Sequence, residues 1–420
     1  MNTYFSDPNL TIYNADVLAG LALLADKSVH CAITSPPYWG LRDYGIPPTA
    51  WPAVEFIPVA GLPPYTVPAM SAVFGLEPDP WSYVGHSVHV FRQMHRVLRD
   101  DGTLWLNLGD SYGGYFGDKY AHKPFGKDRT ADASTPPNKP SNGAMAKQLL
   151  GIPWMVAKAL QADGWYLRQA IIWAKKNCMP ESVNDRPTAS HEYIFLLSKS
   201  QRYYYDAEAV KEASGDWHNS DFHDGKNAEV HPSVGKNRPS RKSGNKERKL
   251  GSSDRTNDHL GSSVPWEGNT RNLRSVWHMA TQPYPEAHFA TFPSALPEIC
   301  IKAGTSENGV CSACGAPWQR VVEKNSTWPD RKLKGEKMRA GSSNNTPNLQ
   351  NMISPVVTTG WLPTCACNAP VIPAIVLDPF AGSGTTNATS ENLGRRSIAI
   401  ETKGEYCALI LKRCHQQQII

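Results

Sequence analysis

One stretch near the C-terminus constrains the fold more than any other part of the chain. Residues 374–394 read AIVLDPFAGSGTTNATSENLG: an apolar run, an acid, a glycine-rich turn and a polar segment of helical character. A strand that passes through a tight glycine turn into a helix is typical of a doubly wound α/β sheet, which binds ligands beyond the carboxyl ends of its strands. The stretch therefore predicts a mainly parallel sheet with a ligand site at this turn.

The other apolar segments alternate between strand and helix patterns, as this fold requires. Strand-like runs are LTIYNADVL, VHCAIT, TLWLNLG, WYLRQAIIWAKK, HEYIFLLSKS and RRSIAIE. Helix-like runs are LALLADKS, VGHSVHVFRQMHRVLRDDG with a glycine stop, GIPWMVAKALQADG, AHFATFPSALPEICIKAG and KGEYCALILKRCHQ. We expect two irregular insertions: the proline-rich segment at about 46–80, outside the core, and the glycine-, lysine- and proline-rich segment at about 112–148.

Charge and composition bound the class of protein. The chain has 420 residues and a formal charge of +5, with its densest basic run at Lys236–Lys249. That run indicates a polyanionic partner, or else a solvated loop. The N-terminus shows no secretory signal and no window is apolar enough to span a membrane, so we expect a cytoplasmic, nucleoid-associated protein with no membrane partner.

The glycine turn has the features of a nucleotide-like ligand site. Glycines let the backbone approach a ligand closely, and Asp378 can face a cationic part of it. Glu401 ends the run RRSIAIE, where an acid commonly binds ribose hydroxyls. A dinucleotide-binding fingerprint would have a third glycine where this chain has Asn387, so the turn departs from that class.

A second motif, Ser35-Pro36-Pro37-Tyr38, ends the apolar run VHCAIT. Prolines fix the backbone, so the Ser35 hydroxyl and the Pro36 carbonyl can be two preorganised acceptors for the hydrogens of an exocyclic amine. Tyr38 can stack on a base taken out of a duplex. The alternative is that the tetrapeptide is only a strand-ending turn.

Together, ITSPPYW and DPFAGSGTT resemble the motifs of the amino-group DNA methyltransferases, which act on N4 of cytosine or N6 of adenine. The catalytic motif precedes the cofactor loop, which is similar to the β-class order of this family. The Thr-Ser-Pro-Pro-Tyr form is similar to the N4-cytosine branch; adenine enzymes more often have Asp or Asn in place of Ser35. IYNADVL, LRDDGTLWLNLGDSY, IIWAKKN, HEYIFLLSKS and HFATFPSALPEICI extend the resemblance over most of the chain.

The resemblance implies a permuted S-adenosylmethionine-dependent methyltransferase fold, S-adenosylmethionine as cofactor, double-stranded DNA as substrate and a cognate restriction endonuclease as a candidate partner. It implies catalytic roles for Ser35, Pro36, Pro37 and Tyr38. The residues that it assigns to the cofactor are Asp16, Phe292, Asp378, Pro379, Phe380, Gly382, Ser383, Gly384, Thr385 and Glu401. It divides the chain into a catalytic half at 1–211, a target-recognition region at 212–280, a cofactor-binding half at 281–304 and 371–420, and a cysteine-bearing insertion at 305–370.

Three other classes of function are weighed against this one. A non-catalytic zinc-containing DNA-binding protein would leave both motifs without a purpose. Methylation of RNA or protein is disfavoured by the order of the motifs. Covalent methylation at C5 of cytosine needs a cysteine nucleophile, typically after a proline, and the sequence has no Pro-Cys pair.

The nine cysteines include two close pairs, Cys311-x₂-Cys314 and Cys365-x-Cys367, separated by fifty residues. Four thiolates in two pairs suggest a structural zinc ribbon, although the second pair is tighter than usual. Free thiols and a redox switch are the alternatives. Cys31, Cys178, Cys300, Cys407 and Cys414 are expected to fill the core. His86, His89 and His95 lack metal-ligand spacing and are expected to pack or to lie at the surface.

Overall fold

The computed structural model describes residues 2–113, 147–178, 180–213, 270–282, 292–324 and 356–416. Most of the predicted insertion at 112–148 and of the basic region at 212–280 lies outside these residues. The chain forms two compact units, the first being Met1–Val210, Asn272–Val321 and Thr358–Ile420. In the second, Lys211–Arg271 and Val322–Val357, β11 (Glu212–Ala213) pairs with β12 (Thr270–Arg271). The first unit contains both sequence motifs.

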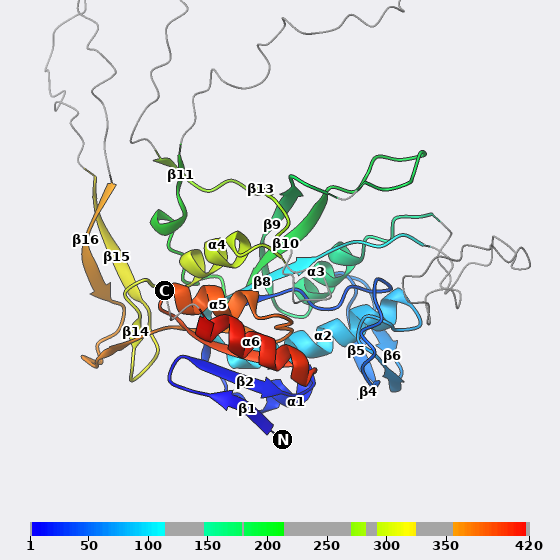
Figure 1. The fold of residues 1–420 in the computed structure, drawn as a ribbon, viewed down its shortest axis with the longest axis horizontal. Helices are drawn as coiled ribbons and strands as arrows, with labels where there is room; N and C mark the ends of the chain where they lie inside the picture. Colours follow the sequence, from blue (N-terminus) through cyan, green and yellow to red (C-terminus); the bar gives the residue numbers. More distant parts are fainter. Residues whose placement is uncertain are drawn as a thin grey trace, which may run out of the picture. The chain divides into compact units, whose positions relative to one another are not determined.

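A nine-stranded sheet is the centre of the first unit, in the order β1-β2-β19-β18-β3-β8-β10-β9-β13 (Figure 1). Its strands are β1 (Asn2–Ser6), β2 (Leu10–Asn14), β3 (Val29–Thr34), β8 (Leu98–Leu108), β9 (Tyr166–Lys175), β10 (His191–Ser198), β13 (Val276–Met279), β18 (Ile375–Asp378) and β19 (Arg396–Glu401). Neighbours from β2 to β8 run parallel, while β10 runs antiparallel to both β8 and β9. The mainly parallel α/β sheet is confirmed, and β1 and β13 add strands that the sequence did not predict.

Helices cover both faces of the sheet. They are α1 (Val17–Ala22), α2 (Pro80–Val97), α3 (Ile152–Ala162), α4 (Ala295–Gly304), α5 (Thr385–Asn392) and α6 (Gly404–Gln416), with a 3₁₀ turn, η1 (Glu208–Val210). Side chains alternate along each strand. Ala32 of β3 therefore packs with α1, α2 and α3, whereas Cys31 and Ile33 pack with α4 on the opposite face, beside α5 and α6 (Figure 1).

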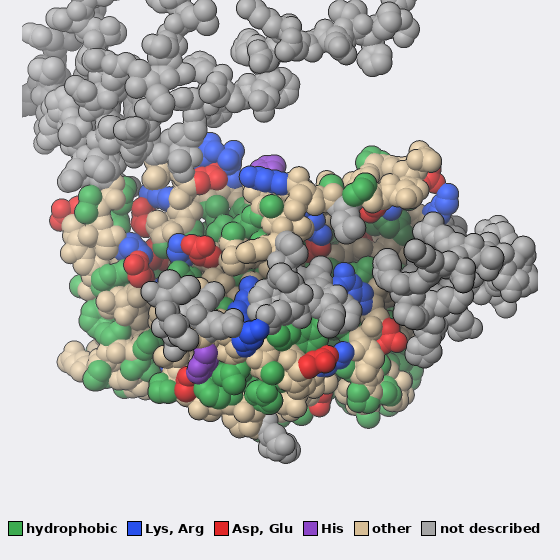
Figure 2. All heavy atoms as spheres, in the orientation of Figure 1, with side chains coloured by type: hydrophobic (Ala, Val, Ile, Leu, Met, Phe, Trp, Pro, Cys, Tyr) green, Lys and Arg blue, Asp and Glu red, His purple; other side chains and the backbone are tan. Residues whose placement is uncertain are grey.

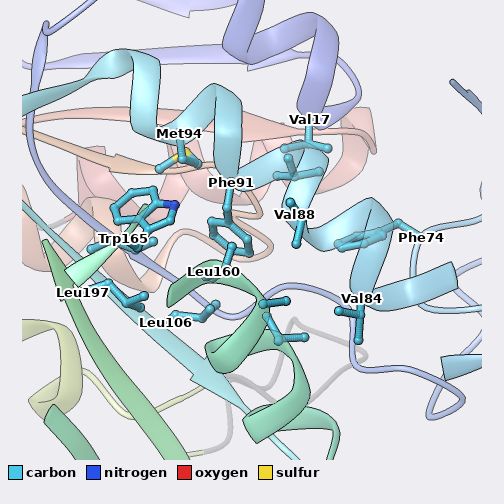
Figure 3. Close-up of a cluster of buried hydrophobic side chains, with 14 of the residues drawn as sticks. Val17, Phe74, Val84, Val88, Phe91, Met94, Leu106, Leu160, Trp165 and Leu197 are labelled. Carbon is cyan, nitrogen blue, oxygen red and sulfur yellow. The ribbon is translucent and has the colours of Figure 1, made fainter. Parts of the chain in front are cut away.

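The larger core lies under α2. Val84, Val88, Phe91 and Met94 recur at helical spacing along α2, and Figure 3 shows them gathered with side chains of the sheet and of α3. All four are fully buried. Asp79 caps the helix by accepting a hydrogen bond from the backbone nitrogen of Ser82 at 3.0 Å. The helix ends at Val97, not at the predicted glycine, because Gly102 already lies within β8.

The prediction that residues 46–80 lie outside the core is wrong. They form the two-stranded pairs β4 (Thr49–Trp51) with β7 (Met70–Ala72) and β5 (Val54–Phe56) with β6 (Tyr65–Val67). Trp51, Phe56, Val67 and Phe74 are buried in the core under α2. Prolines shorten these strands, but their apolar residues still alternate to one side and pack there.

The remaining strands lie in the cysteine-bearing insertion at 305–370 or directly after it. β14 (Val310–Cys311) pairs with β17 (Val371–Ile372), which follows the insertion, and β15 (Trp318–Lys324) pairs with β16 (Val356–Pro363). Across the residues that the structure describes, no helix combines the length and the apolar character that crossing a bilayer requires.

Candidate functional site

The two sequence motifs meet at one edge of the sheet. β3 and β18 are parallel neighbours, with Cys31 opposite Val376, so Ser35 and Asp378 both lie at carboxyl ends of strands. A hydrogen bond joins the motifs directly: the Thr34 hydroxyl donates to Oδ1 of Asp378 at 2.8 Å. The parallel topology thus brings together residues that are far apart in the sequence, at the place where α/β sheets bind ligands.

A cavity of about 390 Å³ opens at this edge. Its lining includes thirteen of the fourteen residues that the sequence assigns to catalysis or to the cofactor, namely Asp16, Ser35, Pro36, Pro37, Tyr38, Phe292, Asp378, Pro379, Phe380, Gly382, Ser383, Thr385 and Glu401. The fourteenth, Gly384, lies behind the loop against Ile410 of α6. A cavity of this size lies in the range that binds cofactor-sized ligands.

The glycine turn needs its glycines. Gly382 and Gly384 have φ angles of +52° and +76°, in the left-handed region that favours glycine. A Cβ atom on Gly384 would lie 3.0 Å from the Ile410 side chain. The Arg413 guanidinium donates to the hydroxyls of Ser383 and Thr385 at 3.2 and 2.9 Å, so α6 holds the start of α5 in place.

Asp378 is buried, and its hydrogen bonds lie within the protein. Besides Thr34, it accepts from the Thr386 hydroxyl at 2.8 Å and from the Phe380 backbone nitrogen at 3.1 Å. Burial raises the pKa of Asp378 to about 6, although the hydrogen bonds from Thr386 and Thr34 act in the opposite direction. The carboxyl group is thus anchored to β3 and α5 and fixes the loop. Asp378 also lines the cavity, and its predicted orientation toward a cationic ligand stays a prediction.

Glu401 is the acid that remains available to a ligand. Its Oε2 accepts from the Gly382 backbone nitrogen and its Oε1 from that of Lys403, each at 2.9 Å. Burial raises the pKa of Glu401 to about 7. A carboxylate oxygen can accept two hydrogen bonds, so each oxygen retains capacity for a ligand hydroxyl.

Asp16 lies two residues after β2, at the start of α1, and lines the cavity. Its carboxylate also caps α1, accepting from the backbone nitrogens of Leu18 and Ala19 at 3.0 and 3.1 Å. Phe380 stacks on Phe74, with ring centroids 5.5 Å apart. The segment at 46–80 therefore supports the cofactor loop directly.

The catalytic motif is held from α2 and from the segment before it. The Tyr83 hydroxyl of α2 donates to the Pro37 carbonyl at 2.9 Å, and the Gly40 backbone nitrogen donates to the Gly75 carbonyl at 2.7 Å. The side chain of Glu77 accepts from the Gly75 backbone nitrogen at 2.9 Å. The first contact holds the motif at Pro37, the second ties the turn that follows it to the segment before α2, and the third fixes that segment, so the backbone of the motif is positioned by the protein itself.

A polar network beside Tyr38 was not predicted from the sequence. Asn107 of β8, Lys175 of β9 and Glu192 of β10 line the cavity next to Ser35. The Tyr38 hydroxyl lies 2.8 Å from Oε2 of Glu192 and 3.1 Å from Oδ1 of Asn107. All three are polar residues within or at an end of a largely apolar strand. That pattern is the feature of the sequence from which the network could have been predicted.

The four paired cysteines converge. The Sγ atoms of Cys311, Cys314, Cys365 and Cys367 all lie within 4.8 Å of one another. Tetrahedral zinc thiolate sites, with Zn–S bonds of about 2.3 Å, place their sulfurs about 3.8 Å apart, so the cluster fits such a site with little adjustment. Among the described residues no other group of three or more potential ligands gathers in this way.

The histidines serve the fold. His86 is fully buried, lies 3.0 Å from Oε1 of Glu77 through its Nδ1 and stacks on Trp51 with ring centroids 4.2 Å apart. His95 packs edge-on against Trp165. The expected packing role is thus seen for these two, and Cys31, Cys300, Cys407 and Cys414 are buried as expected, while Cys178 is only half-buried.

Basic side chains do not form a single patch on the face shown in Figure 2, where Lys and Arg of the described residues lie among Asp and Glu. The basic run Lys236–Lys249 and the target-recognition role predicted for its region fall outside the described residues.

The chain matches the DNA methylase family N6_N4_Mtase over residues 29–312 and 370–412. The protein belongs to this family. Its DNA methyltransferase activity is therefore directed at an amino group of DNA, and the ranges that match include both motifs and the polar network. Residues 313–369, which carry three of the four clustered cysteines, fall between the two ranges.

Two curated relatives extend the match. The Type II methyltransferase M.SmaI of Serratia marcescens is 32% identical over 385 residues, which cover 91% of this chain and 83% of the relative. M.Cfr9I of Citrobacter freundii, another Type II methyltransferase, is 37% identical over 295 residues, covering 70% and 72%. Among solved structures, PvuII DNA methyltransferase (cytosine-N4-specific) aligns with a TM-score of 0.49 at 14% identity, over 98% of this chain and 88% of that one.

Proposed function

We propose that this enzyme transfers a methyl group from S-adenosylmethionine to N4 of cytosine in duplex DNA. The observation that carries the proposal is the position of Ser35 at the wall of the cavity, 2.9 Å from the Tyr38 hydroxyl and beside the cofactor loop. A serine at this place is the form that is similar to the N4-cytosine branch of the family.

S-adenosylmethionine would occupy the part of the cavity between the glycine turn and Phe292. Glu401 would accept hydrogen bonds from the ribose hydroxyls, because its oxygens retain free lone pairs beside the turn. Pro379, Phe380 and Asp16 would contact the remainder of the cofactor from the cavity wall. When bound, the cofactor supplies an electrophilic methyl group.

The protein's contribution to the reaction is orientation and electrostatics. The lone pair of an exocyclic amine is delocalised into the base. Ser35 Oγ and the Pro36 carbonyl would accept the two amine hydrogens and draw the nitrogen toward a tetrahedral geometry. Pro36 lines the cavity beside Ser35, which supports this role for its carbonyl. Tyr38 would stack on the base that has left the duplex, compensating part of the unstacking cost of a few kcal/mol.

N6 of adenine is the second candidate acceptor. It is also an exocyclic amine with two hydrogens, and the same pair of acceptors would serve it. The two candidates are separated by incubating the protein with S-adenosylmethionine carrying a labelled methyl group and unmethylated bacterial DNA, and then separating the nucleosides. We expect label in N4-methylcytosine; label in N6-methyladenine alone would overturn the choice of base.

We also propose that the four clustered cysteines hold a structural zinc ion. The support is the convergence of their sulfurs and the small size of the strands around them, β14 and β17, which have two residues each. Metal would fix an insertion with few apolar residues of its own. A cognate restriction endonuclease is a proposed partner, supported by the Type II names of the relatives.

A further inference from the structure

Glu192 is a carboxylate with little exposure to solvent, and it lies beside Tyr38 of the catalytic motif. Its side chain is 14% exposed, and Lys175 Nζ contacts Oε1 at 2.5 Å. Oε2 accepts from Nδ2 of Asn107 at 3.1 Å and faces the Tyr38 hydroxyl at 2.8 Å. A half-buried carboxylate loses much of its hydration, so it needs pairing and hydrogen bonds, and Lys175, Asn107 and Tyr38 supply donors to both of its oxygens.

The partners of Tyr38 set the direction of its contact with Ser35. Its single hydroxyl hydrogen faces two acceptors, Oε2 of Glu192 at 2.8 Å and Oδ1 of Asn107 at 3.1 Å, and neither oxygen has a hydrogen to give. The Tyr38 hydroxyl therefore donates, and the shorter of the two contacts is the one with Glu192. Toward Ser35, the Tyr38 oxygen can then only accept a hydrogen bond. Ser35 Oγ, 2.9 Å away, therefore donates its own hydrogen to Tyr38.

Asn107 agrees with this direction. Its Nδ2 donates to Glu192 and to the carbonyl of Tyr193, both at 3.1 Å, which turns its Oδ1 toward the Tyr38 hydroxyl as a second acceptor. No group in the network thus donates to Ser35. Its hydrogen is directed inward, away from the substrate, and its lone pairs are left for a donor in the cavity.

We propose that Glu192 is a positioning residue which, through Tyr38, fixes Ser35 as a hydrogen-bond acceptor for the target amine. The inference rests on the proposed role of Ser35. It adds that Glu192 determines whether the Ser35 hydroxyl donates or accepts. A free serine hydroxyl can donate as well as accept. If the Ser35 hydrogen pointed into the cavity, it would face the hydrogens of the target amine. The two would repel, and the amine could not take the position that methyl transfer requires.

The test is a mutant cycle between Glu192 and Tyr38. Glu192→Gln keeps the size of the side chain but can present an amide hydrogen to Tyr38, which permits the hydroxyls to reverse. Tyr38→Phe keeps the aromatic ring and removes the hydroxyl group that connects Glu192 to Ser35. Glu298→Gln, at an exposed ion pair on α4, is the matched control for loss of one carboxylate. The measured quantities are the single-turnover rate of DNA methylation at saturating S-adenosylmethionine and the dissociation constant of S-adenosylmethionine.

We expect Glu192→Gln and Tyr38→Phe each to lower the rate at least tenfold, with the dissociation constant changed less than twofold. The double variant should be no slower than the slower single variant, because both changes break one chain of contacts. Glu298→Gln should match the wild type.

A wild-type rate in Glu192→Gln would overturn the inference, and so would losses that multiply in the double variant, since Glu192 would then act independently of Tyr38. The same assay measures whether the wild type methylates cytosine or adenine. Absence of any methylation by the wild type contradicts the proposed function, whereas an active wild type with an unimpaired Glu192→Gln contradicts this inference alone.

Discussion

Replacing Thr34 by valine removes a side-chain hydrogen bond that joins the catalytic strand to the acid of the cofactor loop. Thr34 is fully buried, and its hydroxyl donates to Asp378 at 2.8 Å. Valine has nearly the same shape, so no cavity forms and the loss is that of the hydrogen bond. A hydrogen bond to a charged group contributes about 1.5–3 kcal/mol, and one between neutral groups about 0.5–1.5 kcal/mol.

The size of the loss should depend on pH, because the pKa of Asp378 is about 6 in the folded protein against a usual 3.8. A raised carboxyl pKa means that the folded state binds the proton more tightly, so this group's contribution to stability is present at low pH and is lost as pH rises through 6. The hydrogen bond from Thr34 lowers this pKa, and removing it raises the pKa further. The variant should therefore lose additional stability relative to the wild type as pH rises through 6.

Urea denaturation followed by tryptophan fluorescence at pH 5 and pH 8 measures both effects. We expect Thr34→Val to lower the free energy of unfolding by about 2 kcal/mol at pH 8 and about 1 kcal/mol at pH 5, from the charged and neutral values above. Thr11→Val is the control, since that hydroxyl makes only a 3.3 Å contact with Ser6 at the surface. Equal losses at the two pH values, or no loss at pH 8, would refute this account of Asp378.

Three further predictions concern the loop, its acid and the cysteines. Gly384→Ala should weaken S-adenosylmethionine binding and lower the melting temperature more than Gly394→Ala does. Both glycines have positive φ (+76° and +70°), but of the two only Gly384 would place its added Cβ 3.0 Å from the Ile410 side chain. Equal shifts in melting temperature would argue against the packing explanation. The dissociation constant of S-adenosylmethionine should fall as pH rises through 7, where Glu401 ionises and can accept both ribose hydroxyls, and isothermal titration of Glu401→Gln should show no such dependence. Purified protein should carry one zinc ion per chain by elemental analysis, and Cys314→Ser should lose it; a metal-free wild type with free thiols would contradict the metal site.

Local patterns were enough to predict much of the fold. Strand-like runs such as VHCAIT and RRSIAIE became β3 and β19, because continuous apolar residues of this length are typical of strands buried on both faces. Residues 46–80 were mistaken for an excursion because prolines obscure the alternation that buries Trp51 and Phe56. Their burial depends on contacts with α2, which no local pattern contains.

The candidate site was predictable where its residues form continuous motifs. Ser35 and Glu401 line one cavity because they lie at the carboxyl ends of β3 and β19, the two parallel strands that flank β18. Glu192 was missed because its role depends on a contact with Tyr38 across 154 positions of the chain. The hydrogen bonds of Asp378 with Thr34 and Thr386 could not be predicted either, since they join residues that only the fold brings together.

The identity of the methylated base tests the central claim most directly. DNA from a methyltransferase-free bacterium expressing this protein would be digested to nucleosides and analysed by mass spectrometry, with cells expressing Ser35→Ala as the control. We predict N4-methylcytosine in the first sample and its absence from the second. N6-methyladenine without N4-methylcytosine, or N4-methylcytosine undiminished in the Ser35→Ala sample, would contradict the proposed acceptor role of Ser35 toward cytosine.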